Sequence, residues 1–264
     1  MSNHPKSLLF TMVALFLLST QVFAAIQTKL ISYRLGSTEL EGFLAYDDKY
    51  KEPRPGVLVF HDWMGVNTKF TKHQTIEMAK LGYVAFAPDI YGKTAQPQNP
   101  QQAMQASSMY KNNRGLMRKR AIAGYQALLD QNLVNPKKIV AVGYCFGGTC
   151  ALELARTGAP LAGIVSFHGG LDNPAPQDAK YIKGPVLVLH GADDPYAPKA
   201  QVEAFEKEMK AASKNYQVIL YPGAVHAFTN PDAGNDPKTG AAYNSSATRK
   251  SWNEFKNFLK NIFK

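Results

Sequence analysis

The chain is poor in cysteine, in long apolar runs and in acidic residues, and each shortage narrows the possible protein classes. Its 264 residues include only two cysteines, Cys145 and Cys150, which excludes a disulfide-stabilised miniprotein. No apolar run reaches the roughly 20 residues that a transmembrane helix needs. Asp and Glu number 20 against 30 Lys and Arg, giving a formal charge of +10. That excess alone would suit a nucleic acid, but no nucleic-acid-binding motif accompanies it, so we expect no such partner.

The N-terminus has the order of segments found in cleaved secretion signals. Lys6 precedes an apolar run over residues 8–18, and small residues surround a cleavage point after Ala24. A basic, an apolar and a small-residue segment in this order are typical of signal peptides. We therefore expect residues 1–24 to be a signal peptide and the mature protein to be exported, either to the periplasm or outside the cell. A retained anchor is the alternative, which the short apolar run disfavours.

Short apolar runs alternate with helix-like segments along residues 25–264 and indicate an α/β protein. Strands are predicted at residues 57–60, 83–87, 138–142, 163–167, 185–189 and 216–221. Helices are predicted at residues 71–81, 118–131, 147–156, 199–213 and 246–263. Runs that are apolar throughout are typical of strands buried on both faces. We expect one domain over residues 25–264, with a mostly parallel sheet covered by helices on both faces.

Two segments depart from this alternation. Residues 30–34 and 42–46 predict an antiparallel hairpin at the edge of the sheet. Residues 92–113 are rich in Gln, Asn, Pro and Ser and predict a long loop or an excursion with short helices. In open α/β sheets such excursions lie beside the ligand crevice at the carboxyl ends of the strands.

Cys145 lies in the sequence GYCFGG, between a predicted strand and a predicted helix. This arrangement has the form of a nucleophile elbow with cysteine in place of serine. The flanking glycines allow the tight turn, and a sulfur at a helix N-terminus is favoured as the thiolate. The backbone N–H of Phe146 would then face a developing oxyanion. A plain strand–glycine–helix turn around a buried cysteine is the alternative.

An acid and a histidine follow the cysteine in the chain order that such an elbow requires. Asp193 and Asp194 follow one predicted strand, and His226 follows the last one. We assign Asp194 to the site, because the Pro-Tyr-Ala-Pro after it fits the family pattern described below and Asp193 is expected to cap a turn. His226 would take the proton of Cys145 or hold its thiolate as an ion pair, while Asp194 fixes the tautomer of the imidazole.

The loop at residues 61–67, after the first buried strand, is expected to supply the second oxyanion donor. The backbone N–H of Trp63 is the candidate. His168 lies in a His-Gly-Gly sequence similar to a lipase oxyanion motif, but it follows the nucleophile strand and is expected to be only a tight strand end. The aromatic side chains of Tyr91, Phe146 and Phe228 either line an apolar acyl pocket or serve in packing alone.

These motifs together resemble the dienelactone hydrolase family of α/β-hydrolases. The resemblance lies in residues 143–148, residues 88–92 (PDIYG), Asp194 with Pro198, and residues 226–228 (HAF). It covers approximately residues 28–264. It implies the α/β-hydrolase fold and a triad of Cys145, Asp194 and His226.

The sequence departs from the family pattern at two places. Family members carry a Glu that holds and helps deprotonate the resting cysteine, and the matching position here is Asp62, one methylene shorter. The alternative role of Asp62 is to cap the following helix. Two arginines that grip a substrate carboxylate in the family match Lys93 and Asn230 here. Lysine cannot chelate a carboxylate through a planar fork, so the resemblance implies hydrolysis more strongly than it implies a dienelactone substrate.

The sequence therefore predicts an exported hydrolase of ester or lactone bonds that acts on a small molecule. We expect no cofactor and a monomer. No metal site is expected either, because the histidines and cysteines have no ligand spacing with a third partner. A catalytically inactive binding protein on the same fold is the competing hypothesis, since a fold does not dictate function.

Overall fold

The computed structural model describes residues 25–264 and Met1, so the predicted signal peptide at residues 1–24 lies outside the described residues apart from its first one. One eight-stranded sheet contains β1 (Ile26–Leu35), β2 (Thr38–Asp47), β3 (Arg54–Phe60), β4 (Val84–Ala87), β5 (Val134–Tyr144), β6 (Gly163–Phe167), β7 (Val186–Gly191) and β8 (Tyr216–Tyr221). The helices are α1 (Lys69–Lys80), α2 (Pro100–Asn112), α3 (Arg114–Leu129), α4 (Phe146–Arg156), α5 (Lys199–Ala211) and α6 (Ser245–Ile262). Short 3₁₀ helices are η1 (Pro176–Tyr181), η2 (Pro231–Ala233) and η3 (Pro237–Thr239).

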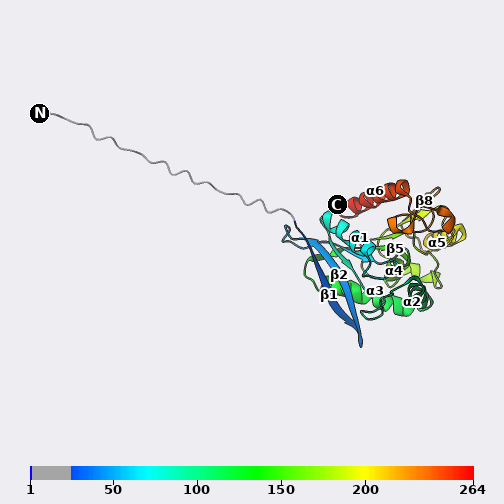
Figure 1. The fold of residues 1–264 in the computed structure, drawn as a ribbon, viewed down its shortest axis with the longest axis horizontal. Helices are drawn as coiled ribbons and strands as arrows, with labels where there is room; N and C mark the ends of the chain where they lie inside the picture. Colours follow the sequence, from blue (N-terminus) through cyan, green and yellow to red (C-terminus); the bar gives the residue numbers. More distant parts are fainter. Residues whose placement is uncertain (2–24) are drawn as a thin grey trace.

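The sheet has the order β1-β2-β4-β3-β5-β6-β7-β8. β1 and β2 pair antiparallel and form the predicted hairpin at one edge, shown in blue in Figure 1. β2 is also antiparallel to β4, and every later pairing is parallel. The predicted mostly parallel sheet is therefore confirmed, and this is the α/β-hydrolase fold.

Alternating side chains of the strands build two apolar cores, one on each face of the sheet. Along β3, Leu58 and Phe60 join the core that contains side chains of α3, α4 and α5. Val57 and Val59 join the other core, with side chains of α1 and α6. Helices thus cover both faces, as predicted (Figure 1).

The largest difference from the sequence prediction is the segment at residues 92–113. It contains α2, a helix of 13 residues, which begins at Pro100 after the Asn99 side chain accepts the N–H of Gln102. A helix of this length is more than the predicted loop or short-helix excursion. The capping asparagine with a proline at the first helical position is the local signal for it.

Among the described residues, no helix has both the length and the apolarity to cross a membrane.

Candidate active site

Cys145 occupies a strained turn between β5 and α4. Its φ angle is 55°, in the left-handed region that non-glycine residues rarely adopt. A Cβ at Gly143 would overlap the carbonyl of Gly147, and one at Gly147 would overlap the carbonyl of Phe60. The glycines on both sides of the cysteine are therefore required by close backbone contact, and the turn leaves the cysteine side chain half-buried at the helix N-terminus.

Three loops at the carboxyl ends of the parallel strands bring Cys145, Asp194 and His226 together. Nδ1 of His226 lies 2.8 Å from Oδ2 of Asp194, and its Nε2 lies 3.0 Å from Sγ of Cys145. The other carboxylate oxygen of Asp194 accepts the backbone N–H groups of Tyr196 and Ala197. The acid is thus fixed by its own loop, and one hydrogen-bonded chain runs from carboxylate to imidazole to sulfur.

The electrostatics of this chain favour a charged imidazole. Burial opposes a charge on His226, but the Cys145 sulfur and the hydrogen bonds to Asp194 and Cys145 outweigh it and raise the pKa of His226 to about 10. Burial likewise acts to raise the pKa of Asp194, but hydrogen bonding and attraction to His226 prevail and lower it. The arrangement suits an imidazolium between a carboxylate and a sulfur, which is the form of an activated cysteine nucleophile.

The neighbouring acid, Asp193, points elsewhere. It is exposed and its Oδ2 accepts the backbone N–H of Gly223, 3.0 Å away in the turn after β8. Its side chain ties two loops together and does not contact His226. The structure thus places Asp194, the acid chosen from the sequence, next to the histidine.

The loop after β3 is held in place by two side chains. His61 Nδ1 lies 2.6 Å from the Asp62 carbonyl, and its Nε2 accepts the backbone N–H of Ile90. Tyr91 donates its hydroxyl to the carbonyl of Trp63 at 2.9 Å and packs its ring against His61. Within residues 25–264, the backbone N–H of Trp63 has no hydrogen-bond acceptor, so it remains available to a ligand.

The first residue of α4 offers a second such group. The backbone N–H of Phe146 also lacks an acceptor in the described part of the chain. At a helix N-terminus a free N–H carries partial positive charge and attracts anions.

Asp62 is buried in the same loop without a hydrogen bond to Cys145. Its Oδ1 accepts the backbone N–H of Met64 at 2.8 Å, so it caps the turn that follows it rather than α1, whose N-cap is Thr68. Burial raises the pKa of Asp62 to about 6, although the Met64 N–H and the charge of His226 act to lower it. A carboxyl group with such a pKa, close enough to His226 to feel its charge, belongs to the electrostatics of the site.

The four residues predicted to bind substrate have different surroundings. Lys93 forms ion pairs with Glu39 and Glu41 at 3.0 and 3.2 Å, so its charge is already compensated. Asn230 uses its side-chain oxygen to accept the N–H of Asp232 at the start of η2.

The two aromatic members of that set are buried. Phe228 is fully buried and packs in the core shared with α1 and α6. Tyr91 is 3% exposed, and its ring contacts that of Phe146 with a centroid distance of 5.4 Å. Tyr91 therefore lies next to the elbow, while Phe228 lies in the core, on the inner side of the loop that carries His226.

Three residues near His226 were not identified as site residues from the sequence. The rings of His168 and Tyr196 both pack against the imidazole of His226, and the Thr229 hydroxyl bonds to His168. Tyr196 lies within the Pro-Tyr-Ala-Pro sequence that identified the acid, so its position was a usable signal. His168 was interpreted as a strand end, and nothing in the local sequence marks Thr229.

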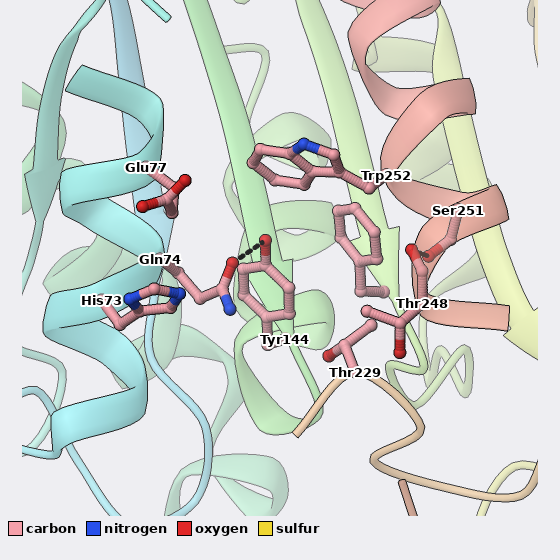
Figure 2. Close-up of a pocket in the computed structure, with 9 residues that line it drawn as sticks. His73, Gln74, Glu77, Tyr144, Thr229, Thr248, Ser251 and Trp252 are labelled. Carbon is pink, nitrogen blue, oxygen red and sulfur yellow. Dashed lines mark hydrogen bonds between the residues drawn. The ribbon is translucent and has the colours of Figure 1, made fainter. Parts of the chain in front are cut away.

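A separate pocket of about 170 Å³ lies between α1 and α6 (Figure 2). Trp252 and Thr248 of α6 face Gln74 of α1 across it, and the Tyr144 hydroxyl bonds to the Gln74 side chain at 3.0 Å. None of the three triad residues lines this pocket, but Thr229 does. The pocket is therefore a neighbour of the candidate active site and distinct from it.

Comparison with known proteins places the whole domain in one family. Residues 40–263 match the model described as "Dienelactone hydrolase family". A protein of Saccharolobus solfataricus named "Putative carboxymethylenebutenolidase" is 30% identical, over 89% of this chain and 99% of its own. A crystal structure of a dienelactone hydrolase-like promiscuous phosphotriesterase from metagenomic libraries is 37% identical, with a TM-score of 0.85 over 91% of this chain and 100% of its own. The structure titled m3DLH is 35% identical, with a TM-score of 0.86 and the same coverage.

Proposed function

The chain belongs to the dienelactone hydrolase family, and we propose that it hydrolyses ester or lactone bonds with a triad of Cys145, His226 and Asp194. The single observation that carries this proposal is the continuous contact from Asp194 Oδ2 through the His226 ring to Cys145 Sγ, with distances of 2.8 and 3.0 Å. Relatives named "Putative carboxymethylenebutenolidase" support the choice of bond, because a butenolide is a lactone.

In the proposed reaction the thiolate of Cys145 attacks the carbonyl carbon, and the carbonyl oxygen becomes an oxyanion. The free N–H groups of Trp63 and Phe146 stabilise that oxyanion. The His226 imidazolium then donates its proton to the departing alkoxide, which leaves a thioester on Cys145. Neutral His226 next accepts a proton from water, and the resulting hydroxide attacks the thioester and restores the thiolate. Asp194 holds the imidazole in the orientation that serves both steps.

Asp62 is proposed to support the charged form of this site. Above its pKa of about 6 it adds a negative charge near His226. That charge favours the imidazolium and, through it, the thiolate of Cys145. In this role Asp62 activates the cysteine through space rather than by a direct hydrogen bond.

The substrate is proposed to be a small ester or lactone without an essential carboxylate. Lys93 is already paired with two glutamates, and Asn230 carries no charge, so neither supplies a strong anion clamp. Tyr91 and Phe228 are buried, so in this proposal they support the elbow and the histidine loop from inside the protein and do not contact the substrate. Equal turnover of matched lactones with and without a free carboxylate is the expected result, and a strong preference for the charged lactone would contradict this substrate class.

We further propose that the protein is exported, with residues 1–24 removed as a signal peptide, and that it acts as a monomer on a small molecule without a cofactor. The support is the order of basic, apolar and small residues before Ala25. N-terminal sequencing of the protein from its natural host should begin at Ala25. A mature N-terminus at Met1 or Ser2 would contradict export through this signal.

The decisive experiment compares the wild-type protein with Cys145→Ala and Cys145→Ser on 4-nitrophenyl acetate and on a simple unsaturated lactone. Loss of turnover in Cys145→Ala, with unchanged folding by circular dichroism, is expected. The buried second cysteine gives a matched control, because Cys150→Ala removes a thiol that has no access to substrate. Unchanged turnover in Cys145→Ala would refute the proposal and favour a binding protein. A phosphotriester belongs in the same screen, since one relative is described as a promiscuous phosphotriesterase.

A further inference from the structure

His226 is held by hydrogen bonds at its two ring nitrogens, and these bonds leave one motion of the ring unrestrained. The bonds reach Asp194 on one side and Cys145 on the other. In an imidazole the hydrogen-bonding directions of Nδ1 and Nε2 point roughly away from each other, so two bonds at these atoms leave the ring able to rock about the line that joins them. Proton transfer depends strongly on orientation, so the site needs a further restraint on this ring.

Two aromatic side chains supply contacts of the required kind. The ring of His168 lies 5.4 Å from that of His226, at an interplanar angle of 66°. The ring of Tyr196 lies 5.2 Å away, at 73°. Both are edge-to-face pairs, which are a favoured geometry for aromatic rings. Tyr196 is 60% exposed, whereas His168 is 1% exposed, so the restraint from His168 comes from inside the protein.

His168 is itself fixed more firmly than ring packing alone would achieve. Its Nε2 lies 2.7 Å from the Thr229 hydroxyl, and its backbone N–H donates to the carbonyl of Leu189 at 2.8 Å. Its φ angle of 39° lies in the left-handed region, a strained conformation that the surroundings must maintain. Its Nδ1 is buried without a partner among the described residues. A buried, strained and incompletely bonded histidine is costly, which points to a role beyond packing.

The charge state of His168 is compatible with its place beside an imidazolium. The titratable groups near it are His226, His190 and Tyr144, whose ring packs against that of His168. Asp194 lies close to both His226 and His190. Burial first, and then repulsion from His226 and His190, keeps the pKa of His168 well below the ordinary value for histidine. His168 therefore stays neutral and does not repel the charged form of His226.

We propose that His168, anchored by Thr229, is a positioning residue that holds the imidazole of His226 in the orientation that contacts both Cys145 and Asp194. Figure 2 shows Thr229 on the wall of the pocket between α1 and α6, so the anchor of His168 lies outside the triad. The inference rests on the proposed function, because it assigns His168 a role in the same reaction.

The test measures Cys145 alkylation by iodoacetamide as a function of pH, together with kcat and KM for 4-nitrophenyl acetate. Mass spectrometry assigns the alkylated cysteine. Thr229→Val removes the anchoring hydroxyl with little change of shape, Thr229→Ser restores a hydroxyl, and His168→Ala removes the ring. Ser251→Ala is the matched control, because it deletes another hydroxyl of the pocket wall, whose one hydrogen bond within residues 25–264 goes to the carbonyl of Thr248.

Without its anchor, His168 should lose the ring contact that orients His226. The free energy of such an aromatic pair corresponds to a kcat about 3- to 10-fold lower in Thr229→Val, with KM changed less than about twofold. The pH at which Cys145 becomes reactive should rise in Thr229→Val and more in His168→Ala, while Thr229→Ser and Ser251→Ala keep the wild-type profile. A merely structural role would lower thermal stability without moving this profile. If Thr229→Val kept both the wild-type kcat and the wild-type profile, the inference would be overturned.

The same data separate this inference from the proposed function. Wild-type Cys145 that reacts with the pH dependence of an ordinary free thiol, in a protein without esterase activity, would contradict the proposed function. If Cys145 reacted at low pH in the wild type and equally in all the variants, only the role of His168 and Thr229 would be contradicted.

Discussion

Replacing Asp194 by Asn separates the electrostatic role of the acid from its structural role. The side chain is fully buried, and its Oδ1 accepts two backbone N–H groups, which an asparagine oxygen can also accept. The loop should therefore keep its shape. The amide group, however, would donate to Nδ1 of His226 and hold the ring proton on Nε2, facing Cys145. In that tautomer the histidine cannot take a proton from the thiol.

The size of the effect follows from the bond that is lost. A hydrogen bond to a charged group contributes about 1.5–3 kcal/mol, which corresponds to roughly 10- to 150-fold in an equilibrium. Holding the wrong tautomer adds to this, and in a serine-protease triad the same change lowers kcat by about 10⁴. We expect kcat/KM of Asp194→Asn to fall by about 10²- to 10⁴-fold, and Cys145 alkylation at pH 6 to slow by roughly 10- to 150-fold.

The neighbouring acid provides the control. Asp193→Asn changes an exposed side chain that, in the described part of the chain, accepts a hydrogen bond from the Gly223 N–H alone. Its kcat/KM should therefore stay within about twofold of the wild type, as for most surface changes. Steady-state kinetics on 4-nitrophenyl acetate, with circular dichroism to verify folding, measures both variants. If Asp194→Asn retained more than about a third of the wild-type kcat/KM while the fold was intact, the assignment of Asp194 as the orienting acid would be refuted.

Four further changes have defined outcomes. Because the pKa of His226 is raised from 6.5 to about 10 in the fold, the stability from its charged pairing is fully present below pH 6.5 and is lost as the pH rises through about 10. The melting temperature of the wild type should therefore fall over that pH range. Asp62→Asn removes a carboxylate whose pKa is raised from 3.8 to about 6 by burial, so its charge destabilises the fold at pH 8. The variant should be more stable there, by up to ~3 kcal/mol in urea unfolding, yet less active, and equal or lower stability would contradict this reasoning. Gly147→Ala places a Cβ against the Phe60 carbonyl and should destabilise by about 1–3 kcal/mol or more. Gly115→Ala on α3, whose Cβ would meet Asn113 Oδ1 at an ordinary contact distance of 3.7 Å, should be neutral or stabilising. Glu153→Gln breaks a buried ion pair with Arg118 and Arg156 and should cost about 3–5 kcal/mol, against little change for the exposed Glu203→Gln.

Strand positions and chain order allowed much of the fold to be predicted. Continuous apolar runs such as residues 163–167 have no polar face, which is why they indicate strands of a parallel sheet. The observed strand β6 has the same bounds, while β5 begins four residues before the predicted start at residue 138. The additional residues of β5 include Pro136 and Lys137, which have no strand pattern of their own. Pairing between Arg54 and Val134 extends the strand there, and this is a tertiary effect.

In the candidate site, likewise, some residues could be predicted from the sequence and others could not. Cys145 is marked by its glycines, because close backbone contact leaves a local signature in the sequence. His168 and Thr229 carry no such signature, since their relation to His226 depends on two loops that are 61 residues apart and meet only in the folded chain. Residues that perform chemistry were therefore easier to predict than residues that hold them in place.

Basic residues that cluster in a sequence, such as Arg118, Lys119 and Arg120 of α3, usually lie on a solvated helix face. Arg118, however, contacts Glu153 of α4 at 2.6 Å, and the Glu153 side chain is fully buried. Arg156, also fully buried, joins Glu153 to Glu208 of α5. Buried ion pairs contribute little net stability, but they penalise any arrangement that leaves one charge unpaired. Because α4 begins directly after Cys145, this network fixes the helix that carries the nucleophile, and Glu153→Gln should therefore lower kcat as well as stability.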